Sequence, residues 1–167
     1  MGNGSRHRES AGVARLLGHL TERRRALRSA LWVRGLRLRG ARIGPGVKVF
    51  GRVSVFGPAR HIAIGEGSSL NEGVVLEARE RIVIGRYCHI SSGVKLHTGY
   101  LVRDADGQLS HGAKPIVIGD HVWIASSAVV GAGATIGDKV TVGANSLVLG
   151  ALMEPGLYAG TPARRVK

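Results

Sequence analysis

"HGAKPIVIGDHVWIASSAVVGAGATIGDKVTVGANSLVLG", residues 111–150, carries an aliphatic residue at every sixth position. The recurring positions are Ile118, Ile124, Val130, Ile136, Val142 and Val148. Gly or Ala follows each of the first five. A period of six matches neither the 3.6-residue period of a helix nor the two-residue alternation of a long strand. The stretch is therefore a sequence repeat, and the chain has to be understood as an array of short units.

The same period runs back to residue 43. Sets of three hexads begin at an Ile-Gly pair, and the five pairs start at Ile43, Ile64, Ile84, Ile118 and Ile136. The last two pairs are 18 residues apart, and the first intervals of 21 and 20 residues add only small insertions. The repeating unit is thus three hexads, and residues 43–153 hold about five such units.

This unit has a simple physical interpretation. Each hexad predicts one short strand that points a single aliphatic side chain inward, and the neighbouring Gly or Ala permits a sharp corner. Three strands close a triangular coil, and stacked coils pair through parallel main-chain hydrogen bonds about 4.8 Å apart. One coil cannot bury its aliphatic residues alone, so stability comes from its neighbours. The sequence predicts an all-β solenoid over residues 43–153, followed by a tail at 154–167.

The composition supports thin aliphatic layers rather than a large aromatic core. The chain has 26 Gly in 167 residues, and only 4% of its residues are aromatic. Cys88 is the single cysteine, which excludes an intrachain disulfide, and its place beside the hexad residue Ile90 predicts a core residue. Neither a secretory segment nor an apolar run of about 18 residues is present. Cytoplasmic residence is therefore the expectation.

Residues 1–42 form a basic segment that precedes the repeat. They contain eleven Arg and two Glu, and so contribute +9 of the net charge of +13. After Ser10, a candidate N-cap, apolar residues recur at helical spacing. These residues are Val13, Leu16, Leu17, Leu20, Leu27 and Leu31.

Two interpretations of the predicted helix stay open. It can cap the first coil, because solenoids need covered ends, or it can lie on an anionic membrane surface. A nucleic-acid-binding arm is disfavoured, because no aromatic residues are interleaved for base stacking.

The sequence also resembles a known family. The stretch "KPIVIGDHVWIASSAVVGAGATIGDKVTVGANSLVLG", followed by "AGTPARRVK", is similar to the C-terminal half of the hexapeptide-repeat acyltransferases of the galactoside, maltose and polysaccharide O-acetyltransferase type. The resemblance implies a left-handed parallel β-helix that assembles as a homotrimer. It also implies acetyl-CoA as co-substrate and no metal.

The repeat is interrupted once, between Leu96 and Ile118, which are 22 residues apart. The inserted loop, residues 97–117, predicts a functional segment, because long loops on rigid scaffolds commonly carry function. In the resembling family such a loop walls the active site beside a neighbouring subunit. Its catalytic His lies five residues beyond the last inward aliphatic residue, a position that Leu101 occupies in this chain.

Two loop histidines can supply the base that acetyl transfer to a hydroxyl requires. Imidazole exchanges protons near neutral pH and is suited to this role. The candidates are His97, at the corner, and His111, on the return limb of the loop. We favour His111, because the chain there returns toward Pro115 and Trp123.

Further site residues follow from the resemblance alone. For the donor, it implies a pantetheine channel at Trp123, Ala125, Ser126 and Ala144, and an adenine and phosphate end at Pro162, Arg164 and Lys167. For the acceptor, the stretch "SLNEGVVLEA" places Asn71 and Glu77 at hydroxyl groups.

The predicted function is an acetyl-CoA-dependent O-acetyltransferase acting on a hydroxyl of a sugar, a glycolipid or a surface polysaccharide. One alternative is acetylation of an antibiotic-like or amine acceptor. Another is a catalytically inactive β-helix scaffold, because position 101 lacks an imidazole. The zinc carbonic anhydrases share the fold, but they need two of three histidines about five residues apart. Here His89, His97, His111 and His121 are spaced by 8, 14 and 10 residues.

Overall fold

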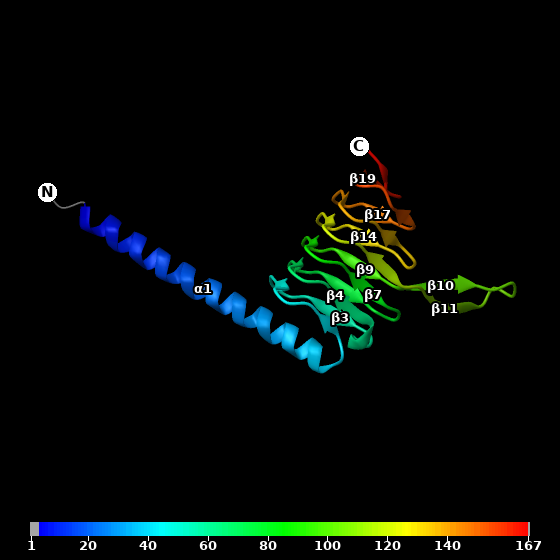
Figure 1. Cartoon of the computed structure of the whole chain (residues 1–167), viewed down its shortest axis with the longest axis horizontal. Helices are drawn as coiled ribbons and strands as arrows, with labels where there is room; N and C mark the ends of the chain where they lie inside the picture. The colour runs from blue at the N-terminus through cyan, green and yellow to red at the C-terminus, as the bar shows by residue number, and fades with distance from the viewer. Residues whose placement is uncertain (1–3, 167) are drawn as a thin grey trace.

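The computed structural model describes the backbone of residues 4–166 and the side chains of residues 21–166. Figure 1 shows one long helix, α1 (Gly4–Leu38), which leads into a stack of short parallel strands. The strands of this stack form three sheets, A, B and C, which the chain visits in that order on each coil, and two further strands form a separate hairpin. The prediction of a parallel β-solenoid with an N-terminal helix and one extruded loop is confirmed.

The three sheets have the following strands. Sheet A contains β1 (Arg42–Ile43), β4 (Ile62–Ile64), β7 (Ile82–Ile84), β12 (Ile116–Ile118), β15 (Thr135–Ile136) and β18 (Ala151–Leu152). Sheet B contains β2 (Lys48–Val49), β5 (Ser69–Leu70), β8 (His89–Ile90), β13 (Trp123–Ile124), β16 (Val140–Val142), β19 (Gly156–Ala159) and β20 (Arg164–Arg165). Sheet C contains β3 (Ser54–Phe56), β6 (Val75–Glu77), β9 (Lys95–His97), β14 (Val129–Val130) and β17 (Leu147–Val148). A short 3₁₀ helix, η1 (Ala59–His61), lies between β3 and β4.

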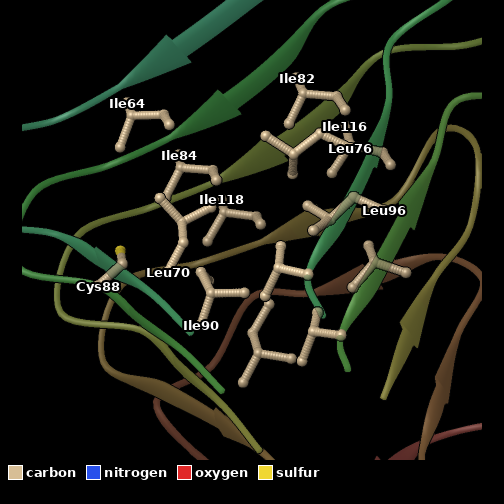
Figure 2. Packing of buried hydrophobic residues seen from close by; sticks show 14 of the residues in the cluster. Ile64, Leu70, Leu76, Ile82, Ile84, Cys88, Ile90, Leu96, Ile116 and Ile118 are labelled. Carbon is tan, nitrogen blue, oxygen red and sulfur yellow. The ribbon is translucent and has the colours of Figure 1, made fainter. Parts of the chain in front are cut away.

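Register between coils places like residues in columns. On sheet A, Ile64 pairs with Ile84, and Ile84 pairs with Ile118. Figure 2 shows these side chains together with those of the other two sheets, such as Leu70 and Leu96, meeting in one interior. The hexad positions are therefore the core, as the period of six predicts.

Cys88 belongs to this interior. Its side chain is fully buried, and its thiol donates to the main-chain oxygen of Gly119 at 3.0 Å. Burial raises the pKa of the Cys88 thiol, which disfavours the reactive thiolate. The prediction of a core cysteine is confirmed.

The stack continues beyond the five sets of hexads. β18 and β19 add a sixth strand to sheets A and B. β20 then turns back and pairs antiparallel with β19. The last residues thus close the C-terminal end of the solenoid.

The corner glycines act through close approach between coils. A Cβ atom added to Gly65 would lie 2.5 Å from the carbonyl carbon of Gly85 in the next coil. The left-handed backbone that turns this corner occurs two residues later, at Gly67, where φ is 68°. Two positions therefore share the role predicted for the corner glycine. Gly65 allows the close approach between coils, and Gly67 adopts the left-handed backbone of the turn.

Helix α1 packs on the first coil through the residues near its C-terminal end. Val33 and Leu36 are buried, and the Ser29 hydroxyl accepts a 2.8 Å hydrogen bond from the main-chain N–H of Val49. The Arg37 guanidinium donates to the carbonyl oxygen of Ile43 at 2.7 Å, and Trp32 packs against the core. The capping interpretation is confirmed for this part of the helix.

Two details of the helix prediction are wrong. The helix begins at Gly4, so Ser10 lies inside it and is not an N-cap. The face that packs on the solenoid is not the one that carries Leu27 and Leu31, which are 62% and 60% exposed. Val13, Leu16, Leu17 and Leu20 lie outside the residues whose side chains the structure describes. Within the described part of the chain, no helix has the length and apolar character needed to cross a bilayer.

We predict that Leu36→Ala and Leu38→Ala separate the two faces of α1. Leu36 is 4% exposed and Leu38 is 80% exposed. Leu36→Ala should lower the free energy of unfolding by about 2 kcal/mol, because it leaves a cavity against the first coil. Leu38→Ala should change it by less than about 0.5 kcal/mol. Equal effects of the two variants in denaturant titrations would contradict the packing described here.

Candidate active site

The loop between β9 and β12 is a β-hairpin. Its strands are β10 (Gly99–Arg103) and β11 (Leu109–Ala113), which pair antiparallel and project from the solenoid (Figure 1). The Asp104 carboxylate closes the turn by accepting the N–H of Gln108 at 2.8 Å, which fits the role of a turn former. The hairpin leaves the corner between sheets C and A, hereafter the C–A corner.

Thr98 and Glu77 fix the base of this hairpin. The Thr98 side chain is fully buried, and its hydroxyl donates to the main-chain oxygen of Glu77 at 2.8 Å. The Glu77 carboxylate accepts the N–H of Gly99 at 2.9 Å and the Nε–H of Arg79 at 2.8 Å. These contacts attach the start of the insertion to the second coil. At the other end of the insertion, the Lys114 N–H donates to Thr98 O at 2.9 Å. The hairpin therefore starts from a defined position.

A pocket of about 270 Å³ opens at the hairpin base. It is lined by Glu77, Arg79, His97, Gly99, Tyr100, Leu101 and His111. The structure thus brings together both histidines that the sequence offers as bases. It also brings one of the two acceptor residues, Glu77, to the same place.

The hairpin register relates His111 to the position at which the resembling family has its histidine. Leu101 and His111 are direct cross-strand partners. Side chains of such partners project from the same face of an antiparallel pair. An imidazole carried by β11 therefore stands beside the side chain of residue 101. His97 takes a different place, because it lies in the ladder of sheet C opposite Glu77.

A second group of predicted residues lies at the corner between sheets B and C, hereafter the B–C corner. Trp123, on β13, is 51% exposed, and its indole N–H donates to the Ser91 hydroxyl at 3.0 Å. Ala125 and Ser126 follow β13, and Ala144 lies one coil further along the same corner. Their main chains are stacked: Ala125 N–H donates to Val142 O at 2.9 Å, and Ser126 O accepts Asn145 N–H at 3.0 Å.

Asn71 belongs to the B–C corner as well. Its side-chain amide donates to Ile90 O at 3.3 Å, and it helps line a pocket of about 380 Å³ with Phe50, Glu72 and Ser92. The structure therefore separates Asn71 from Glu77, which the resemblance places at one acceptor.

The C-terminal tail carries the last predicted group. Pro162 and Arg164 line a pocket of about 260 Å³ with residues 149–152, at the C–A corner of the last coil. Lys167 lies outside the described residues. Within the described part of the chain, no cluster of three or more His, Cys, Asp or Glu side chains could hold a metal ion.

Comparison with known proteins identifies the family of this chain. Residues 115–150 match the family described as bacterial transferase hexapeptide (six repeats). The Escherichia coli K12 protein WcaF, assigned as a colanic acid biosynthesis acetyltransferase, is 35% identical over 77% of this chain and 69% of its own length. The chain belongs to the hexapeptide-repeat acetyltransferases.

Two further relatives agree with this assignment. WbbJ of E. coli K12, assigned as a lipopolysaccharide biosynthesis O-acetyl transferase, is 30% identical over 75% of this chain and 66% of its own. A hexapeptide-repeat acetyltransferase of Vibrio cholerae, solved with acetyl coenzyme A, is 30% identical, with a TM-score of 0.73. That match covers 79% of this chain and 73% of the other. The predicted enzyme class, acyltransferase, is confirmed.

In this acetyltransferase the predicted site residues occupy different corners of one triangular solenoid, hereafter the prism. The histidines are at the C–A corner, whereas Trp123 and its neighbours are at the B–C corner. Within one chain, the return limb of the loop therefore does not place His111 beside Trp123. Our preference for His111 assumed that these two residues lie close together.

Sequence reasoning missed two side chains of the pocket at the hairpin base, those of Arg79 and Tyr100. Arg79 pairs with Glu77, and the Lys114 ammonium lies 5.5 Å from the centroid of the Tyr100 ring. A Cβ atom added to Gly112, opposite Tyr100, would collide with this ring, so the register fixes it over β11. Tyr100 and Val102, whose side chains favour strands, could have indicated a hairpin strand, but its register depends on the turn.

We predict that Glu77 anchors the hairpin. Glu77→Ala should speed hydrogen–deuterium exchange in residues 99–113 by at least about tenfold, because it removes a charge-assisted hydrogen bond and an ion pair. Glu77→Gln should recover part of the protection, since an amide oxygen can still accept the Gly99 N–H. Glu80→Ala is the matched control, as Glu80 is a neighbouring, partly exposed carboxylate that pairs with Arg81. Unchanged hairpin exchange in Glu77→Ala would show that Glu77 has no anchoring role.

Proposed function

We propose that this enzyme transfers the acetyl group of acetyl-CoA to a hydroxyl group of a sugar, within a surface polysaccharide or glycolipid. The observation that carries the proposal is the pocket that gathers His97 and His111 at a clamped hairpin base. The assigned roles of WcaF and WbbJ in colanic acid and lipopolysaccharide biosynthesis support a sugar acceptor. The acetyl-CoA complex of the V. cholerae relative supports the donor.

The chemistry needs a base, an oxyanion site and a leaving thiolate. His111 accepts the proton of the acceptor hydroxyl as its oxygen attacks the thioester carbonyl carbon. Main-chain N–H groups at the small corner residues stabilise the negative charge that develops on the carbonyl oxygen. The carbon–sulfur bond then breaks, and the thiolate recovers the proton from the imidazolium.

The complete site forms between protomers of a trimer. A two-stranded hairpin is marginally stable alone in water, yet this one exposes Leu101, Val102 and Leu109. Packing against the B–C corner of a neighbouring protomer would cover Leu101 and Leu109, which project from the same face of the hairpin as His111. It would also bring the pocket that holds His111 to the Trp123, Ala125, Ser126 and Ala144 of that neighbour, which form the pantetheine channel.

The adenine and phosphate end of the donor lies at the C-terminal tail. Pro162 lines the tail pocket together with Arg164, whose guanidinium can bind phosphate oxygens. The family resemblance assigns Lys167 to the same end of the donor. Asn71, on the B–C corner, contacts the acceptor from the neighbouring protomer's side.

We expect His111→Ala to lower the turnover of a soluble glycoside acceptor by at least about a hundredfold, because general-base catalysis contributes about 10²–10⁴-fold. Acetyl-CoA affinity should be unchanged. His97→Ala should cost less, since its ring starts from the strand ladder. The rate at which the free thiol of coenzyme A appears measures the turnover of both variants. A larger loss in His97→Ala would transfer the role of base to His97, and loss in neither would favour an inactive scaffold.

Arg164→Ala should give the opposite pattern. Coenzyme A affinity, measured by calorimetry, should fall at least about tenfold through loss of a charge-assisted contact with phosphate, while turnover at saturation is retained. Arg165→Ala is the matched control, because Arg165 is adjacent and exposed but does not line the tail pocket. Equal affinities in all three proteins would remove the tail from the donor site.

We expect light scattering to give three times the 17.6 kDa mass of one chain. Leu109→Asp, at a side chain that is 55% exposed, should shift the protein toward lower mass, because a charge would then be buried at the contact. A monomeric mass for the unmodified protein at micromolar concentration would rule out a site shared between protomers.

One alternative acceptor class has an observation in its favour. The pocket contains the Glu77 carboxylate, which could bind an ammonium group. If amines but not glycosides are acetylated in the same assay, the enzyme is an N-acetyltransferase.

A further inference from the structure

Helix α1 uses only one of its faces to cover the solenoid. The covering face consists of Ser29, Trp32, Val33 and Leu36, whose spacing of three, four and seven residues places them along one side of the helix. Figure 1 shows the rest of the helix running away from the first coil as a single rod. The other residues that the structure describes therefore leave its opposite side uncovered.

That opposite side carries an exposed apolar stripe formed by Leu27, Leu31 and Leu38. These side chains are 62%, 60% and 80% exposed. Leu31 and Leu38 follow Leu27 by four and eleven residues, which is about one and three turns, so all three lie on one side. In sequence the same spacing continues upstream through Val13, Leu16, Leu17 and Leu20, whose side chains the structure does not describe.

The stripe lies within a strongly basic surface. Residues 21–39 contain seven Arg and a single acidic residue, Glu22. At 100° per residue, Arg23 and Arg34 flank one edge of the stripe, and Arg24 and Arg28 flank the other. All four are exposed.

We propose that this stripe and its arginines dock the enzyme on an anionic lipid bilayer, with α1 lying in the plane of the membrane surface. The leucines enter the boundary between headgroups and acyl chains, and the arginine stems extend beside them so that the guanidinium groups meet lipid phosphates. The solenoid, which packs on the other face of α1, then faces away from the lipid.

Charge decides against two other occupants. A second copy of this helix would bring Arg24 and Arg28 against their own counterparts, and such like-charge contacts oppose association. A nucleic acid would satisfy the arginines but leave the leucines in water. An anionic bilayer satisfies both groups at once.

The test is sedimentation of the full-length protein with two kinds of vesicle, one of phosphatidylcholine alone and one of phosphatidylcholine mixed with phosphatidylglycerol. The protein should sediment with the mixed vesicles, much less with the neutral ones, and less as salt is added. The double variant Leu27→Gln/Leu31→Gln should partition at least about tenfold less, because each leucine loses its apolar burial. Gln keeps helix propensity close to that of Leu.

Arg24→Gln/Arg28→Gln tests the charge separately. It should lower partitioning by about tenfold and weaken the salt dependence, since each basic residue near the surface contributes to binding. Met153→Gln is the matched control, because Met153 is 57% exposed and lies in the last coil, far from α1. Far-UV circular dichroism checks that each variant keeps its fold.

Three results would overturn the proposal. The first is equal sedimentation of the protein with both kinds of vesicle. The second is unchanged vesicle partitioning in both double variants. The third is a lower light-scattering mass of Leu27→Gln/Leu31→Gln with vesicle binding intact, which would show that a second copy covers the stripe. None of these measurements depends on acetyl transfer. Failure here therefore leaves the proposed activity standing, and an inactive enzyme could still bind the vesicles as expected.

Discussion

Close stacking of successive coils through main-chain hydrogen bonds constrains everything else in this molecule. Coils spaced about 4.8 Å apart leave no room for a Cβ atom at Gly65 or Gly85, and they force like residues into columns. Each column then has to be filled by side chains of similar size, because the spacing is fixed by the backbone. This constraint explains the hexad pattern in the sequence, which has one inward aliphatic residue per strand and a small residue beside it.

A scaffold stacked in this way has little freedom to build a site from its strands. Inward positions are occupied by the core, and outward positions lie on flat faces. Functional groups must therefore come from corners and insertions. In this enzyme the insertion is the hairpin, and its usefulness depends on how firmly it starts. Buried Thr98 and the paired carboxylate of Glu77 provide that start, and the antiparallel register then carries His111 back to the pocket.

The sequence predicts the solenoid well because its period is set by the backbone spacing, which is local. The sixth coil escaped the pattern, since Leu152 is followed by Met153 where the earlier Ile residues of sheet A are followed by Gly. The orientation of α1 also escaped it, because periodicity reveals an apolar side of a helix but not which partner covers it. Ser29 and Trp32 give no strong apolar signal, yet they lie on the side that packs.

Site residues were predictable as types more than as a constellation. His97 and His111 do share a pocket, but the reason is the hairpin register, which depends on a turn closed by Asp104. Asn71 and Glu77 are six residues apart, which is one hexad, and one hexad moves the chain to the next corner of the triangle. Any two residues separated by one hexad are close in sequence but lie at different corners of the coil. Linear motifs in a solenoid therefore indicate a corner and a coil, but not a shared pocket.

The triangular cross-section has a further consequence for catalysis. A base on one corner and a donor channel on another cannot face each other across the interior, because the interior is solid with aliphatic side chains. They can face each other only across a gap between two prisms. Head-to-tail contact between the C–A corner of one chain and the B–C corner of the next is heterologous, so it must close into a ring or grow without limit. With two corners engaged at the angle of a triangular coil, a ring of three protomers would close. The proposed trimer is therefore compatible with the same coil geometry that fixes the core.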